Sequence, residues 1–141
     1  MSWSTPKTDW SISYDENGVY TGDYFNIGDY NRIKGNIEYI HTLANIMYKD
    51  FNITAMAEKT GVDDYPYAEE INILERNLVV LCEKTEFFST TAKTYYSNQP
   101  YLDYIELNRI ERMICELYNK LHSQAEGRRM FTFMLGAKEV F

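Results

Sequence analysis

Two histidines, His41 and His122, are the side chains of this sequence best suited to proton transfer near neutral pH. Neither stands near a cysteine or a carboxylate at the spacing of a metal site or a catalytic triad, and catalysis needs a positioned set of groups. The acidic pairs Asp15-Glu16 and Asp63-Asp64 lack the spaced oxygen ligands of a calcium loop. We therefore expect no catalytic residue, no metal site and no cofactor. An enzyme would need a pocket in which a histidine meets a carboxylate.

Other residues that often carry chemistry also lack the necessary context. Gly22 and Gly28 are not followed by the lysine and hydroxyl residue of a phosphate-binding loop. Cys82 and Cys115 lie in apolar runs with no CxxC spacing, so we expect free thiols that behave as small buried hydrophobic groups. These residues add no candidate reaction.

Charge and hydropathy restrict the partners. The chain has 14 Lys and Arg against 21 Asp and Glu, and the net charge of −7 argues against a nucleic-acid partner, because phosphates attract a positive surface. The start MSWSTPKTDW has no apolar signal region, and no stretch is apolar for long enough to span a membrane. We expect a protein of a reducing cytoplasm with no membrane partner.

Three stretches with an apolar residue at every third or fourth position predict amphipathic helices at about 27–48, 67–84 and 104–124. The apolar positions are Tyr30, Ile33, Ile37, Ile40, Ala44 and Met47 in the first stretch, Ile71, Leu74, Leu78 and Leu81 in the second, and Leu107, Ile110, Ile114, Leu117 and Leu121 in the third. Each apolar stripe is too wide to leave in water, so the three helices should pack on one another. The expected fold is mainly α, a three-helix bundle in a single domain that covers residues 1–141.

A motif around an asparagine recurs as YNRIKG at 30–35, INILER at 71–76 and LNRIER at 107–112. We interpret it as part of three related loop–helix repeats, at 7–48, 59–83 and 84–125, followed by a C-terminal segment at 126–141. The residues expected to build the helix starts and the repeats are Asn26, Asp29, Asn31, Glu70, Asn72, Asp103, Glu106 and Asn108. In this set Asn26 and Asp103 are candidate N-caps, with an acid three residues later.

The recurring asparagines need a reason, because asparagine forms helices poorly. We hypothesise that Asn31, Asn72 and Asn108 bond backbone in the loop at a helix start. The alternative is three solvated residues at the edge of each apolar stripe. The neighbouring Arg32 and Arg109 could pair with acids, although exposed ion pairs stabilise little.

The remaining segments are expected to be extended. Alternating apolar residues around Asn17-Gly18 predict a short β-hairpin at 11–21, and residues 51–58 and 130–135 could form strands. The terminal segments should be extended, and the apolar C-terminal segment would either dock on the helices or bind a partner. Aromatic residues that could contact another protein are Trp10, Tyr24, Phe87, Tyr101, Phe131, Phe133 and Phe141.

Several of these motifs together resemble small proteins and modules encoded in tail gene clusters of phages and prophages of Gram-positive bacteria. The shared motifs are Lys7–Trp10, Tyr24–Asn26, Asn31–Ile33 and Asn108–Glu111, and FTFMLGAKEVF at the C-terminus is similar to the apolar endings of such modules. The middle copy, Asn72-Ile73-Leu74, departs from the pattern because it has no arginine.

The resemblance implies assembly and not catalysis. It predicts a non-enzymatic structural or adaptor protein of a phage or prophage tail that binds other tail or virion proteins and forms a homo-oligomer. Its location would be the virion, after assembly in the bacterial cytoplasm. The alternative is a cytosolic phage-encoded binding module that regulates a host protein.

Overall fold

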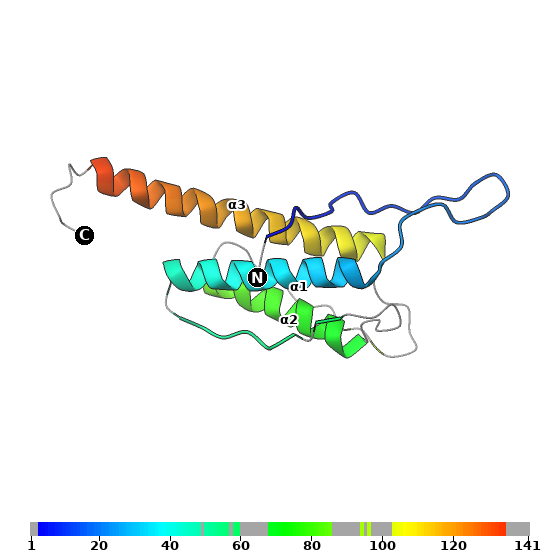
Figure 1. Cartoon of the computed structure of the whole chain (residues 1–141), viewed down its shortest axis with the longest axis horizontal. Coiled ribbons are helices and arrows are strands. Elements are labelled where there is room, and N and C mark those ends of the chain that lie inside the picture. Colours follow the sequence, from blue (N-terminus) through cyan, green and yellow to red (C-terminus); the bar gives the residue numbers. More distant parts are fainter. Residues whose placement is uncertain are drawn as a thin grey trace.

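A computed structural model describes residues 3–48, 50–56, 58–59, 68–85, 94, 96 and 103–134, with side chains described as far as residue 127. Three helices, α1 (Ile27–Met47), α2 (Ala68–Thr85) and α3 (Tyr104–Met134), pack against one another (Figure 1). The part of the chain that is described contains no β-strand. The prediction of a mainly α fold with three packed helices is therefore confirmed.

The three helices run in the same direction, with their N-terminal ends together (Figure 1). Near these ends Arg32 of α1 pairs with Glu111 of α3 at 2.8 Å. Toward the other end of α1, the Tyr48 hydroxyl donates to the side chain of Gln124 in α3 at 2.6 Å. For α2 to run parallel to α1, the chain between them must return to the N-terminal end of the bundle. The described residues of this segment do so, since the backbone of Lys59 bonds Asn31 near the start of α1.

The core forms where the three apolar stripes meet. The most deeply buried large side chains are Tyr30, Ile33, Ile37 and Ile40 of α1, Ile71, Leu74, Leu78 and Leu81 of α2, and Ile110, Ile114, Leu117 and Leu121 of α3. Full burial of one such side chain is favourable by roughly 1.5–3 kcal/mol. Packing of these stripes therefore holds together helices that would be marginal alone.

The starts of α1 and α3 carry polar caps. The side chain of Asn26 accepts a hydrogen bond from the backbone of Asp29, and the Asp29 carboxylate accepts one from the backbone of Asn26, both at 3.0 Å. Asp103 accepts from the backbone N–H of Glu106 at 2.9 Å. These bonds satisfy N–H groups that the first helical turn leaves without a partner.

The C-terminal part of the chain differs from the prediction. Helix α3 does not end at about residue 124 but continues to Met134, so residues 126–134 are neither extended nor a strand. Gly127 is the poorest helix former in this stretch, and its cost of about 1 kcal/mol relative to alanine does not end a helix. Residues 51–56 are irregular rather than a strand.

Candidate functional site

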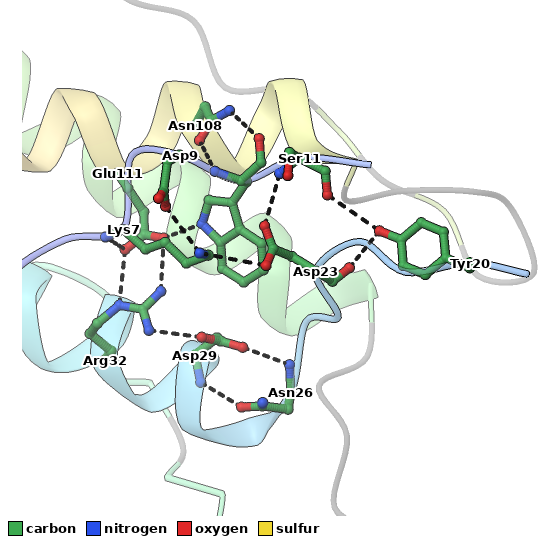
Figure 2. A network of polar contacts seen from close by, with 11 residues as sticks. Lys7, Asp9, Ser11, Tyr20, Asp23, Asn26, Asp29, Arg32, Asn108 and Glu111 are labelled. Atoms are coloured by element: carbon green, nitrogen blue, oxygen red, sulfur yellow. Dashed lines mark hydrogen bonds and ion pairs between the residues drawn. The ribbon is translucent and has the colours of Figure 1, made fainter. Parts of the chain in front are cut away.

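The buried carboxylate of Glu111 is the centre of a polar network at the N-terminal end of the bundle (Figure 2). It accepts from the Arg32 guanidinium, at 3.0 Å from Nε and 2.8 Å from Nη2, and from the backbone N–H of Lys7 at 3.0 Å. It also accepts from the indole N–H of Trp10. The same guanidinium binds Asp29 at 2.7 Å. These contacts join α1, α3 and the N-terminal segment at one carboxylate.

Asn108 holds the next part of that segment. Its amide oxygen accepts from the backbone N–H of Trp10 at 2.8 Å, and its amide nitrogen donates to the Trp10 carbonyl at 2.9 Å. The Trp10 side chain is buried, with 4% of the residue exposed. The ring therefore packs into the core of its own chain, and its role as a contact to another protein stays a prediction.

Three more asparagine side chains each bind the N–H and the carbonyl of one backbone residue, an arrangement called here an asparagine clamp. Asn31 binds Lys59 at 2.7 and 3.1 Å, Asn36 binds Ser4 at 2.8 and 2.9 Å, and Asn77 binds Thr54 at 2.8 and 2.9 Å. Each clamp fixes a non-helical segment against a helix. Asn72 is buried, and the segment that it would hold in this scheme lies outside the described residues.

The clamps by Asn36 and Asn77 were missed at the sequence level. A signal for them was present, because each follows one of the recurring asparagines by five positions: Asn36 follows Asn31, and Asn77 follows Asn72. A second unfavourable helix residue at a fixed interval indicates a positional role.

A second buried carboxylate, Glu75 of α2, accepts from Arg109 of α3 at 2.5 and 2.8 Å. Arg109 also binds Glu106 at 2.7 Å. Burial alone would lower the pKa of the Arg109 guanidinium, but its hydrogen bonds to Glu75 and Glu106 outweigh burial and raise it. For Arg32, too, burial lowers the pKa, but hydrogen bonds to Glu111 and Asp29 outweigh burial and raise it. Glu70, which was predicted to help build the start of α2, pairs with the Lys59 ammonium at 2.6 Å.

Residues 11–24, called here the arm, project away from the three helices (Figure 1). The chain reverses at Asp15–Gly18, where Gly18 adopts the positive φ of 80° that favours glycine. Backbone bonds join the two limbs at Asp15–Val19, Thr21–Ser13 and Asp23–Ser11. Gly22 is required where the limbs meet, because a Cβ atom there would lie 2.8 Å from the Ser11 carbonyl.

Two backbone N–H groups of the arm donate to aspartate carboxylates and not to backbone carbonyls of the opposite limb. Asp15 accepts from the backbone of Val19 at 2.9 Å, and Asp23 accepts from the backbone of Ser11 at 2.9 Å. The arm therefore holds its reversal with a single antiparallel bridge, between Tyr14 and Tyr20, rather than with paired strands.

The arm presents apolar side chains to solvent. Tyr14, Tyr20 and Tyr24 form edge-to-face contacts with centroids 5.4 and 4.9 Å apart. The exposed fractions are 52% for Ile12, 63% for Tyr14, 58% for Val19 and 70% for Tyr24. A cluster of this kind on one projecting element marks a candidate binding surface, whereas single exposed apolar residues do not.

The remaining predicted contact residues are less informative. Phe87, Tyr101 and Phe141, like the acidic pair Asp63-Asp64, lie outside the described residues. Phe131 and Phe133 lie on α3, but their side chains are also outside the described part.

The histidines have structural partners. His41 contacts the Phe51 carbonyl through Nε2 at 2.6 Å, and His122 lies 3.4 Å from the Tyr39 hydroxyl. His41 also borders an open groove with Glu38 and Asp50, but its ring nitrogen bonds backbone instead of either carboxylate. Within the described ranges, no cluster of His, Cys, Asp and Glu is arranged to hold a metal ion.

No described helix combines the length and the apolar character needed to cross a membrane. Comparisons with protein-family models, with curated proteins and with solved structures found no match to this chain.

Proposed function

We propose that the chain is a non-enzymatic structural or adaptor protein that works by binding other proteins. The observation that carries this proposal is the arm, which holds four large apolar side chains in solvent. The Glu111 network and the Asn108 clamp fix the chain where it leaves the helices toward the arm. A fixed arm loses little conformational entropy when it binds.

We place this activity in a phage or prophage tail, with other tail or virion proteins as partners. The motifs at Lys7–Trp10 and Asn108–Glu111 support this assignment through their resemblance to tail-cluster modules. In the structure these two motifs contact each other, because Glu111 and Asn108 bind Lys7 and Trp10.

Particles from the producing cells test this assignment. After density-gradient sedimentation and quantitative mass spectrometry, we expect the chain to sediment with the particles at a constant ratio to the main tail proteins. A chain found only in the unsedimented fraction would contradict the tail assignment. If that fraction held it in complex with a host protein, the regulatory alternative would replace it.

We also propose that the three loop–helix units are related repeats. Asn31 of α1 holds the segment before α2, and Asn108 of α3 holds the segment before α1. The ion pairs Arg32–Glu111 and Arg109–Glu75 likewise join equivalent positions. Each arginine lies one residue after the recurring asparagine of its own helix, and each glutamate lies three residues after that of its helix. The hairpin predicted at 11–21 stays a prediction beside this proposal.

The third ion pair of such a repeat would join positions 73 and 34, where Ile73 and Lys34 stand. In this chain, neither position carries the residue that the ion pair of the other units has. We expect Ile73→Arg and Lys34→Glu each to destabilise the chain, and the double variant to recover a coupling free energy of about 1–2 kcal/mol. Urea unfolding of the four proteins measures this energy. Strictly additive effects would contradict the equivalence of the three units.

A further inference from the structure

We propose that the arm binds an extended segment of a different protein, one that carries apolar residues and at least one Lys or Arg. The segment would pair as a strand along the outer edge of Ile12–Tyr14. This inference rests on the proposed binding function and specifies the partner and the mode of binding.

On the outer edge of the arm, the backbone groups of Ile12 and Tyr14 bond to no other group in the part of the chain that the structure describes. Ser11 and Ser13 use their carbonyls, and Asp15 uses its N–H, to bond the opposite limb. Because backbone groups alternate in direction along an extended chain, those of Ile12 and Tyr14 face the other side. An exposed edge of this kind is a template for one more strand.

The negative charge of the arm favours a partner segment with Lys or Arg. Residues 11–24 include Asp15, Glu16 and Asp23 but no lysine or arginine. Asp15 and Asp23 use their carboxylates to bond backbone within the arm, and Asp23 also pairs with the Lys7 ammonium at 3.6 Å. Glu16 makes no bond among the described residues. Glu16 is thus positioned to meet a cation, and a cationic segment gains from the acidic field.

The same charge disfavours a second copy of this chain as the occupant. Two arms paired edge to edge would bring two sets of acidic residues together, and the whole chain carries a net charge of −7. Like charges across an interface disfavour the complex. A basic segment of another protein has no such cost.

The arm already has the shape that binding needs. Its limbs are joined by three backbone bonds and by the Ser13–Thr21 hydroxyl pair at 2.8 Å. Within the second limb, the Tyr20 hydroxyl donates to the Asp23 carbonyl at 2.6 Å. The exposed rings of Tyr14 and Tyr24 flank Tyr20 on one surface. They supply rigid apolar contact area beside the edge.

Site-specific photo-crosslinking in the producing cells tests the inference. The full chain would carry benzoylphenylalanine in place of Tyr14 or Tyr24, and in place of Ile46 as a control that is 76% exposed at the far end of α1. We expect both arm positions to crosslink to an extended segment of another polypeptide that contains Lys or Arg, and position 46 not to do so. Mass spectrometry of the crosslinked peptides identifies the segment.

A charge reversal sharpens the test. Glu16→Lys should lower the crosslink yield from position 14 about fivefold, because it replaces attraction by repulsion. Glu116→Lys, at an exposed position of α3, should leave the yield unchanged. Unchanged yield with Glu16→Lys, a crosslink to a second copy of the chain, or a crosslink to a helical or acidic segment would overturn the inference.

The outcomes also separate this inference from the proposed function. Crosslinks from position 46 to a virion protein, with none from the arm, would reject the arm and keep the assembly role. No crosslink from any position, together with no sedimentation with particles, would reject both.

Discussion

Replacing Glu111 by alanine is expected to lower the free energy of unfolding by about 3–5 kcal/mol, the cost of breaking a buried ion pair by removal of one partner. The variant leaves the Arg32 guanidinium, the Trp10 indole and the Lys7 backbone without their common acceptor. Urea denaturation followed by circular dichroism measures the loss. We also expect Trp10 fluorescence to shift as the N-terminal segment loosens.

Two further variants show whether the effect comes from the network. Glu116 lies on the same helix but is exposed, so Glu116→Ala should change stability by less than about 0.5 kcal/mol. The double variant Arg32→Met with Glu111→Leu should be more stable than Glu111→Ala, because it also removes the guanidinium that Glu111→Ala leaves without its buried partner. Equal small losses for Glu111→Ala and Glu116→Ala would show that the network contributes little.

Replacing Ile110 by aspartate is expected to unfold the chain. Ile110 is 1% exposed between the three helices, and a carboxylate placed there has no cation to pair with among its apolar core neighbours. A loss above about 4–5 kcal/mol would use up most of the stability of an ordinary domain. Far-ultraviolet circular dichroism and the loss of a cooperative thermal transition measure this result.

Ile105 provides the matched control on the same helix. It is 57% exposed, so Ile105→Asp should keep the helical spectrum and a cooperative transition. If Ile110→Asp retained native stability, or if both substitutions were equally damaging, the assignment of the buried stripe of α3 would be wrong.

The helices were predictable because their determinants are local. Spacings of three and four, as in Ile110, Ile114 and Leu117, define a buried stripe whatever the partner is. The cap of α1 was equally readable, since Asn26 and Asp29 lie within one turn. The end of α3 was not, because no local stop signal such as proline separates residue 124 from Met134.

The polar network was only partly predictable, because its partners lie far apart in the chain. Asn108 was expected to bond backbone, but nothing in the sequence points to Trp10, which is 98 residues away. Glu111 follows Arg109 in a charged motif and resembles a solvated residue, yet it is buried against Arg32 of another helix. Trp10 appeared to be a surface aromatic for the same reason: tertiary packing decides its burial.

The parallel order of the helices matters most, because it gathers the helix starts at the end of the bundle from which the arm projects. Distances between paired spin labels measure this order directly, after Cys82 and Cys115 are replaced by alanine. One label is placed at Ile46 and the other at Ser123 or at Ile105. These two positions of α3 are 18 steps apart along the helix, an axial offset of about 27 Å. Parallel helices predict a short 46–123 distance and a clearly longer 46–105 distance. The reverse order would contradict the fold on which the arm and its anchor depend.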